Sequence, residues 1–530
     1  MLRTVSTDSR RAAEAYASGL WVADTLADSL REAARSTPDR EVLVDGPTRL
    51  DCRTLHDRAT ALAAAMLARI PVGSVVSFML PNWHEAAIVY HGATLAGMVV
   101  NPILPSLRDH ELSFILADAD VRMIFVPAEF GGHDYSAMLA RVTADMPAPP
   151  EIVVVRGEAP PGQTNFEALS GNEPAGWPVL NPDAVRMILY TSGTTGRPKG
   201  VLHSHNSIHA LIRQIGRHWL VESGDRFLVP SPIAHIGGSI YAFECPILLG
   251  STAVLMDRWN AERAVDLLVA ERCTHMAGAT PFLEQILAAA RTKGTRLPDL
   301  KVFICGGASV SPSLIRGAAD YFEHAIVSRV YGSTEVPVTT VGSPDDPGHA
   351  AETDGRAGIA TIRLAAHPVA PDGAGEICAR GPQMLVGYLH PEDDAEAFDA
   401  DGYFHTGDLG RLLDDDYLVV TGRAKDIIIR NGENIAPKEV EDVLIGHPDI
   451  SEVAVVGLPD PRTGERACAV VVSAAPPGPT VADLREFLAA QGVATFKSPE
   501  QVVVWDALPK NDAGKILKHR IRARLVDSHE

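Results

Sequence analysis

The alternation of short apolar runs with amphipathic helical stretches constrains the fold of this chain more than any other feature. Between about Leu26 and Leu300, residues 75–80 and 121–126 are apolar runs, and residues 53–67 form a typical helical stretch. Such a rhythm predicts an α/β fold with layered parallel sheets, because a helix usually connects consecutive parallel strands and covers one face of their sheet.

Further strands are predicted from apolar segments at residues 186–190, 253–256 and 302–305. Each is followed by a turn rich in Gly, Ser, Thr or Pro, and ligands bind at such strand ends in open α/β sheets. Between residues 351 and 420 the pattern changes to short strands separated by Gly and Asp turns. This change predicts a small β-rich subdomain.

A chain of 530 residues is longer than one hydrophobic core usually organises, so we expect at least two domains. The best boundary is the turn at residues 421–426, which divides the chain into a large domain (1–421) and a small α+β domain (422–530). Pro437 suits the first position of a helix in the small domain, where Val440 and Leu444 share one face. Strands are expected at 453–457 and 467–473, and a loop within the small domain at 475–480.

Composition excludes several classes of protein. The net charge of −20 argues against a general nucleic-acid surface, which needs clustered Lys and Arg. The N-terminal stretch mixes charged residues into short apolar runs, unlike a signal peptide or a membrane-spanning helix. The six cysteines are scattered and form no CxxC pair, which favours buried free thiols in a reducing compartment. We therefore expect a cytoplasmic protein without an integral membrane segment, and the sequence leaves open whether it is a homodimer.

The run YTSGTTGRPKG at residues 190–200 directly follows the predicted strand RMILY. Its glycines let backbone amides approach phosphate oxygens, its hydroxyls add donors and its lysine adds charge, so it suits a polyphosphate. It is not a Walker loop, because Gly200 stands where that motif has a Ser or Thr. GTTG alone would also suit a surface turn. The candidate ligands are Thr191, Ser192, Gly193, Thr194, Thr195, Gly196 and Lys199.

This run resembles the phosphate-loop signature of the adenylate-forming superfamily, which includes acyl-CoA synthetases, nonribosomal peptide synthetase adenylation domains and firefly luciferase. Other signatures follow in order over essentially the whole chain, and the segment formed by Tyr331, Gly332, Ser333, Thr334 and Glu335 is similar to the YGxTE element. The resemblance implies that Tyr331 lies on adenine, Thr334 contacts the α-phosphate and Glu335 holds Mg²⁺. A carboxylate beside phosphate suits a hard cation, although YGSTE alone would more often begin a helix.

Two further segments resemble nucleotide-binding signatures of the superfamily. Gly306, Gly307 and Ala308 match the adenine-side loop, where small residues let a flat base lie against the backbone. Asp408 and Arg423 resemble the pair that binds the ribose hydroxyls. Taken singly, each of these would equally suit an ordinary turn or surface residue, so their order and spacing carry the interpretation.

The resemblance also implies roles outside the nucleotide pocket. His235 matches a position at the mouth of the acyl pocket, although a lone His beside Ile and Gly would also suit the core. Lys515 matches the catalytic lysine, and Lys425 matches the hinge about which the small domain rotates. Gly432 lies in NGEN, where many relatives have GGEN, beside the expected pantetheine path of coenzyme A. Asn431 tolerates a left-handed turn there.

Together these matches predict a ligase that uses ATP, Mg²⁺ and coenzyme A. A carboxylate would attack the α-phosphorus of ATP, and coenzyme A would then displace AMP from the acyl-AMP. The segments 235–241, 276–280 and 336–338 are expected to line the acid pocket and are apolar or small, which favours a neutral hydrocarbon body. Acetate-specific relatives place Trp where Gly332 stands, so medium-chain or alicyclic acids such as cyclohexanecarboxylate are expected.

Two other functions remain open at this stage. The enzyme would instead load a separate acyl carrier protein if a carrier replaced coenzyme A. The third hypothesis is an inactive homologue that only binds an acyl group or a nucleotide. The charged residues expected in the active enzymes, Lys515, Glu335, Asp408 and Arg423, are all present, which argues against it.

Overall fold

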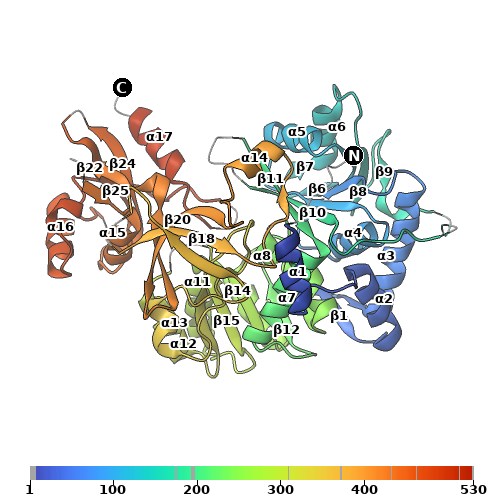
Figure 1. Ribbon diagram of the computed structural model, residues 1–530, viewed down its shortest axis with the longest axis horizontal. Helices are drawn as coiled ribbons and strands as arrows, with labels where there is room; N and C mark the ends of the chain where they lie inside the picture. The colour runs from blue at the N-terminus through green and yellow to red at the C-terminus, as the bar shows by residue number, and fades with distance from the viewer. Residues whose placement is uncertain are drawn as a thin grey trace.

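The computed structural model describes residues 8–171, 174, 176–191, 197–307, 310–370, 373–430, 433–460, 462–474, 476–511 and 514–527. The larger part of the chain forms layered sheets and helices, and the C-terminal elements lie together at one end of the long axis, drawn in orange and red (Figure 1). The predicted α/β fold with a smaller C-terminal part is confirmed.

Two large sheets organise the N-terminal part. In the first, five neighbouring pairs are parallel and the edge pair β1–β2 is antiparallel. The order is β16 (Ile326–Val330), β15 (Val302–Gly306), β14 (His275–Gly278), β12 (Arg226–Val229), β13 (Thr252–Leu255), β1 (Glu41–Asp45) and β2 (Thr48–Asp51). The second sheet runs β19 (Gly387–Tyr388), β11 (Lys199–Ser204), β10 (Val185–Thr191), β4 (Val99–Pro102), β3 (Val75–Phe78), β5 (Val121–Pro127), β8 (Glu151–Val155) and β9 (Thr164–Asn165).

The second sheet departs from the predicted parallel pattern at one end. Strands β10 and β11 pair antiparallel, and β19 continues this pattern from a segment far along the chain. Parallel pairing resumes from β10 to β4 and on to β9. The predicted phosphate loop therefore connects two antiparallel strands, and its second strand is covered by a segment near Tyr388.

Helices pack on both large sheets and share the core with their strands. Helix α4 (His84–Leu95) is buried along nearly its whole length, because its sequence is apolar all round. It packs on α3 (Cys52–Leu67), at the place predicted for a helix, within a core that both sheets share. The other helices of this part are α1 (Ser9–Ala17), α2 (Leu26–Ser36), α5 (Asp109–Asp118), α6 (Tyr135–Thr143), α7 (His205–His218), α8 (Ile236–Ser239), α9 (Cys245–Leu248), α10 (Ala261–Ala270), α11 (Thr280–Lys293), α12 (Pro312–Tyr321), α13 (Pro347–Glu352) and α14 (Pro391–Ala395).

A four-stranded antiparallel sheet follows, as predicted from the β-rich sequence between residues 351 and 420. Its order is β17 (Thr361–Ala365), β18 (Gly375–Arg380), β20 (Phe404–Leu413) and β21 (Tyr417–Arg423). In Figure 1 it lies between the large sheets and the C-terminal elements. Short pieces elsewhere are β6 (Glu129–Phe130), β7 (His133–Asp134), the 3₁₀ turns Phe166–Ala168, Ala424–Asp426 and Thr495–Lys497, and a π-helical segment, Ile240–Glu244.

The C-terminal elements have a core of their own. Strands β22 and β24 flank β25, which also pairs in parallel with β26. Pro437 occupies the first turn of its helix, and Val440 and Leu444 are buried, as predicted. The elements are β22 (Ile428–Arg430), β23 (Glu433–Ile435), α15 (Pro437–Leu444), β24 (Ile450–Asp460), β25 (Gly464–Ser473), α16 (Val481–Ala490), β26 (Gln501–Val504) and α17 (Lys518–Asp527).

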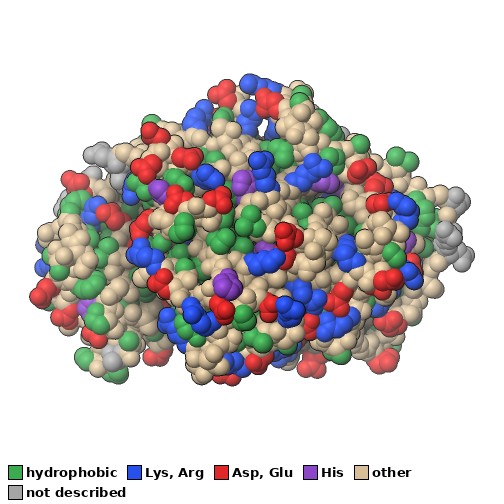
Figure 2. All heavy atoms as spheres, turned by 90° about the horizontal axis from the view of Figure 1, so that it is seen from below, with side chains coloured by type: hydrophobic (Ala, Val, Ile, Leu, Met, Phe, Trp, Pro, Cys, Tyr) green, Lys and Arg blue, Asp and Glu red, His purple; other side chains and the backbone are tan. Residues whose placement is uncertain are grey.

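The cysteines and the surface charges bear on the expectations from composition. All six cysteines are buried free thiols, as predicted. On the face shown in Figure 2, acidic and basic side chains are interspersed over the visible surface. None of the helices in the described part of the chain combines the length and apolar character that crossing a membrane requires.

A buried ion pair joins β10 to the π-helical segment inside the shared core. Arg186 and Glu244 form a salt bridge with side chains that are only 3% and 1% exposed. The Tyr90 hydroxyl lies between them, donating to Glu244 and accepting from Arg186 Nη1 at 2.9 Å. Because a lone buried charge cannot be solvated, each partner depends on the other.

We expect Glu244→Gln to lower the free energy of unfolding by about 3–5 kcal/mol, because Arg186 would remain buried without its counter-charge. Urea unfolding checks this. The control is Asp39→Ala, which removes an exposed pair with Arg53 (83% and 59% exposed) and should cost at most about 1 kcal/mol. Equal, small losses in both variants would mean that the buried pair contributes nothing.

Candidate active site

The predicted phosphate loop is held between paired strand ends. Thr191 is the last residue of β10 and lies opposite Lys199, the first residue of β11. Ser192, Gly193, Thr194, Thr195 and Gly196 lie outside the described residues. A strand, not a helix, follows the loop, which agrees with the distinction from a Walker motif.

Two cations lie at the end of this loop. Lys199 Nζ is 3.2 Å from Asp393 Oδ1, and Arg197 Nη2 is 2.8 Å from Asp393 Oδ2. The Lys199 ammonium also lies 5.2 Å from the ring centre of Tyr388. Asp393 pairs with both cations but offsets only one of their two charges, so an anionic ligand at the loop would compete with this carboxylate and balance the remaining charge.

Glu335 faces the same loop from the YGSTE segment. Its Oε1 atom lies 3.2 Å from the Tyr388 hydroxyl and 3.5 Å from Thr191 Oγ1, both placed to donate to it. Burial, and then the negative charge of Glu335, raise the pKa of Tyr388, which keeps this hydroxyl a donor. The half-buried carboxylate surrounded by hydroxyls fits Mg²⁺, which prefers oxygen ligands.

A buried histidine holds the backbone beside Glu335. His203 Nε2 lies 2.8 Å from the carbonyl oxygen of Thr334. Burial lowers the pKa of His203 to about 4, so the ring is neutral and Nε2–H donates to that carbonyl. Its Nδ1 atom then accepts from Ser207 Oγ at 3.2 Å. His203 thus fixes the position of Thr334.

Tyr331, Asp408 and Arg423 meet at a second part of the site. The Tyr331 hydroxyl donates to Asp408 Oδ2 at 2.8 Å, and Arg423 Nε lies 2.8 Å from Asp408 Oδ1. Asp408 and Arg423 are direct partners across β20 and β21, so strand register sets their pairing. Burial and the Asp408 charge raise the pKa of Tyr331, which therefore stays protonated.

Lys515 reaches this group from the C-terminal part of the chain. Burial and the charge of Arg423 lower the pKa of Lys515 from 10.5 to about 8, and Asp408 opposes this shift. Its backbone N–H donates to Asn511 Oδ1 at 2.8 Å, which closes the loop that carries it. Lys425, the predicted hinge residue, is another cation that lowers this pKa, so both lie in one electrostatic environment.

Two glycines of the predicted adenine-side loop have a steric reason to be glycine. A Cβ on Gly306 would lie 2.5 Å from Val330 Cγ1 in the neighbouring strand. Gly307 has a φ of +81°, where L side chains are strained. Ala308 lies outside the described residues, as does Gly432.

The sequence predicted that Gly332, which has no side chain, leaves room for a bulky acid. In the structure, however, backbone atoms already fill the space where a side chain of residue 332 would begin. A Cβ would lie 2.6 Å from Val338 N and 3.1 Å from Val336 O, both backbone atoms of the following turn. Substitution by Trp would therefore displace this turn and does not isolate the size of an acid pocket. Ser333 stabilises the same turn by accepting from Val336 N at 3.1 Å.

His235 stands at the start of α8, and its carbonyl accepts from Gly238 N and Ser239 N at 2.9 Å. A cavity of about 340 Å³ lies next to the preceding segment, where Pro232 and Ile233 line it together with Arg108. Asn82 also lines this cavity and holds the segment by donating to Ser231 O at 2.9 Å and accepting from Ile233 N at 3.1 Å.

The structure brings together Thr191 with Glu335, and Tyr331 with Asp408 and Arg423. Lys515 lies in the electrostatic surroundings of Asp408 and Arg423. Sequence reasoning missed Tyr388, Asp393 and His203. None of the three belongs to a recognised motif. Tyr388 and Asp393 lie in the polar segment GYLHPEDD, and a polar segment after a strand is the one signal that could have marked them as candidate site residues.

Comparison with known proteins gives consistent matches over nearly the whole chain. A family model described as AMP-binding enzyme matches residues 30–389, and one described as AMP-binding enzyme C-terminal domain matches residues 439–515. The chain is 34% identical to the medium-chain fatty-acid–CoA ligase of Escherichia coli, covering 99% of this chain and 94% of that protein.

Two other relatives bear on the chemistry. The fatty acid–[acyl-carrier-protein] ligase ScoC of Streptomyces coeruleorubidus is 32% identical, with 91% of this chain and 93% of that protein covered. The crystal structure of ATP-bound MatB from Rhodopseudomonas palustris matches with a TM-score of 0.83 and 26% identity, covering 96% of this chain and all of that one.

The lowered pKa of Lys515 predicts a pH dependence. If the Lys515 ammonium meets the phosphates of ATP, kcat/KM for ATP should fall about tenfold per pH unit above about pH 8, because the charged form is lost as the pH rises through this pKa. Measuring pyrophosphate release from pH 6.5 to 10 checks this. Lys515→Arg keeps its charge and should move the fall to higher pH; an unchanged fall would assign the titration to another group.

Proposed function

This chain belongs to the family of AMP-binding enzymes, and from that membership we propose that it is an adenylate-forming acyl-CoA ligase acting on medium-chain or alicyclic acids. It would join the acid to coenzyme A in two steps, first forming acyl-AMP and pyrophosphate and then acyl-CoA and AMP. The observation that supports this most directly is the contact of Asp408 with both Tyr331 and Arg423, in whose electrostatic surroundings Lys515 lies.

In the first step, the acid's carboxylate attacks the α-phosphorus of ATP and pyrophosphate leaves. We assign the ribose hydroxyls to Asp408 and the adenine to Tyr331, beside Gly306 and Gly307. The ammonium of Lys515 would neutralise negative charge that develops on the phosphate as the bond to pyrophosphate breaks. Such preorganised charge stabilisation and positioning are the main sources of catalysis in reactions of this kind.

Residues around the loop would hold the polyphosphate. Lys199 and Arg197 would exchange Asp393 for phosphate oxygens, and the Thr334 hydroxyl, on a backbone held by His203, would contact the α-phosphate. Glu335, with the hydroxyls of Tyr388 and Thr191 beside it, would hold a Mg²⁺ ion that accompanies ATP. Bound there, the cation supplies positive charge that screens the phosphates.

For the second step, coenzyme A must reach the acyl-AMP after Lys515 has withdrawn. Lys425 lies in the 3₁₀ turn Ala424–Asp426, directly between β21 and the C-terminal elements, and a few backbone angles there would suffice to rotate those elements. We place this hinge at the start of the small domain (422–530), next to its boundary with the large domain (1–421). The rotation would bring the segment with Gly432 toward the acid.

An apolar acid is favoured by the surroundings of the segment after His235. Tyr241 stacks on Phe227 with ring centres 5.3 Å apart, and Phe227 stacks on His275 at 4.8 Å. Burial lowers the pKa of His275, so this ring is neutral and gives no counter-charge to a second carboxylate. The name of the E. coli relative points to acids of medium length. His235 would control entry to this region.

A carrier protein is the alternative acceptor of the acyl group. The ScoC relative, whose name states that it loads an acyl carrier protein, is almost as similar as the CoA ligases. The two functions share the first step and differ only in the thiol of the second.

The proposal predicts the products. With ATP, Mg²⁺ and a panel of C4 to C12 and alicyclic acids, AMP and pyrophosphate should form, and coenzyme A should convert the acyl-AMP to a thioester. Chromatography of the nucleotides and acyl products measures both steps. Release of ADP and orthophosphate would refute adenylation. Thioester formation only with an added phosphopantetheinyl carrier protein would establish the alternative.

Lys515→Ala should separate the two steps. We expect acyl-AMP formation to slow by about 100- to 1,000-fold, since one preorganised charge contact is lost. Thioester formation from preformed acyl-AMP should be unchanged, because the rotated C-terminal elements no longer present this residue. Rapid-quench assays of each half-reaction measure the two rates. Equal, severe losses would show that Lys515 is structural or serves both steps.

A further inference from the structure

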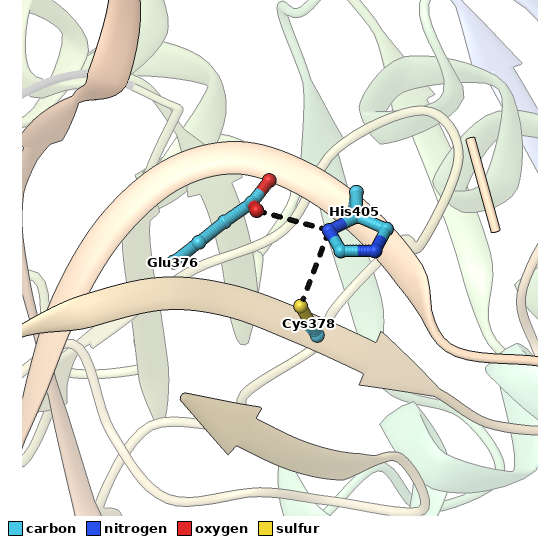
Figure 3. Close-up of side chains that lie close together, drawn as sticks. All are labelled: Glu376, Cys378 and His405. Atoms are coloured by element: carbon cyan, nitrogen blue, oxygen red, sulfur yellow. Dashed lines mark hydrogen bonds and ion pairs between the residues drawn. The ribbon is translucent and has the colours of Figure 1, made fainter. Parts of the chain in front are cut away.

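A Glu, a Cys and a His gather on the antiparallel sheet, away from the loop residues described above. Glu376 and Cys378 come from β18 and His405 from β20, and their side chains point toward one another (Figure 3). Strand register explains this meeting, since Cys378 lies directly opposite His405. Glu376 is two residues before Cys378, so both side chains leave the same face of β18.

The separations between the ligand atoms approach those of a tetrahedral metal site. Cys378 Sγ is 3.5 Å from His405 Nδ1, and Glu376 Oε2 is 2.9 Å from the same nitrogen. Bonds of about 2.3 Å to sulfur and about 2.0–2.1 Å to nitrogen, at a tetrahedral angle, place sulfur and nitrogen about 3.6 Å apart. The Cys–His pair already has this spacing, and the carboxylate needs to move by roughly half an ångström.

We propose that Glu376, Cys378 and His405 bind a zinc-like divalent cation, at a site separate from the one assigned to Mg²⁺. One sulfur, one nitrogen and one oxygen ligand suit Zn²⁺ far better than Mg²⁺, which prefers oxygen alone. Cys378 binds as the thiolate, so its proton passes to solvent when the cation enters.

Access and fixed orientation support this assignment. The side chain of His405 is 33% exposed and that of Glu376 14%, so a cation can enter and water can complete its coordination. The second oxygen of Glu376 accepts from Gly407 N at 3.1 Å, and a hydrogen bond of this kind fixes the orientation of a carboxylate that binds a metal.

The charges around the cluster are balanced. Arg363 lies opposite Cys378 on β17, close enough for its charge to act on the thiol, and its guanidinium also pairs with Asp399 and lies 3.5 Å from Asp401. Two carboxylates therefore offset this arginine, and Glu376 remains to attract a divalent cation.

A similar cluster elsewhere shows what excludes a metal. Asp45, His84 and Glu85 also bring their ligand atoms close together. Arg156 already supplies the cation there, with Nη2 2.5 Å from Asp45 Oδ2 and Nε 2.8 Å from Glu85 Oε1. Since a guanidinium fills that cluster, we assign the cation only to the cluster of Glu376.

The position of the cluster links it to the residues around Asp408. Gly407, whose N–H is bound by Glu376, directly precedes Asp408 on β20. Thr406 Oγ1 donates to Ile377 O at 2.7 Å and accepts from Asp408 N at 3.1 Å. A cation held by β18 and His405 would therefore fix the backbone on which Asp408 stands.

The test is Co²⁺ titration of the metal-free full-length protein without nucleotide. We expect one Co²⁺ per chain, with sulfur-to-metal charge-transfer absorption that disappears when Zn²⁺ displaces it. Cys378→Ser should abolish this absorption, and it and His405→Gln should each weaken binding at least tenfold. Cys468→Ser, which removes a buried strand cysteine elsewhere, is the matched control and should bind as wild type.

X-ray absorption spectroscopy of the Zn²⁺-loaded wild-type protein measures the metal–ligand distances directly. It therefore tests the proposal even if a variant fails to fold. We expect one sulfur neighbour at about 2.3 Å and nitrogen or oxygen neighbours at about 2.0–2.1 Å. A shell of nitrogen and oxygen alone would overturn the proposal, as would equal Co²⁺ affinity in the folded Cys378→Ser variant and the wild type. Neither measurement depends on whether the protein uses ATP.

Discussion

The arrangement of the site depends on the contacts made by the carboxylate of Asp408. It accepts from the Tyr331 hydroxyl, pairs with Arg423 and attracts the ammonium of Lys515, so it joins three separate regions of the chain. Without this negative charge, the positive charges of Arg423 and Lys515 would repel each other. Asp408 thereby offsets the repulsion between two cations at the proposed nucleotide contact.

Strand pairing provides the rigidity that this contact needs. Asp408 is fixed by its register with Arg423, and the Thr406 hydroxyl bridges its backbone to β18. The same pairing of β18 with β20 creates the cluster of Glu376, Cys378 and His405 a few residues away. One short sheet therefore serves both the proposed nucleotide contact and the proposed cation site.

The opposite side of the site is organised by buried hydrogen bonds. His203 holds the Thr334 carbonyl, and Tyr388 and Thr191 surround the Glu335 carboxylate. These groups come from strands β10, β11 and β19, which follow one another in the sheet although β19 is distant in the sequence. Preorganised donors of this kind require no rearrangement when charge develops nearby, which suits phosphate chemistry.

Much of the fold was predictable from the sequence, because hydrophobic periodicity and turn residues act over short distances. The apolar runs that became β3, β5, β13 and β15, and the helix opened by Pro437, are local consequences of side-chain pattern and backbone preference. Motif residues such as Lys199 and Glu335 were also identifiable, since their types and spacing carry chemical information without coordinates.

Only the tertiary structure decided which of these residues meet. No local pattern indicates that Tyr388 would reach Glu335, that Asp393 would neutralise Lys199, or that Arg186 and Glu244 would share one buried tyrosine. Such contacts depend on strand order and register between distant segments, and on burial, which lowers the pKa of Lys515 to about 8. The sequence determined which chemical groups were present, and the folded chain determined their distances and dielectric surroundings, because both properties arise from long-range packing.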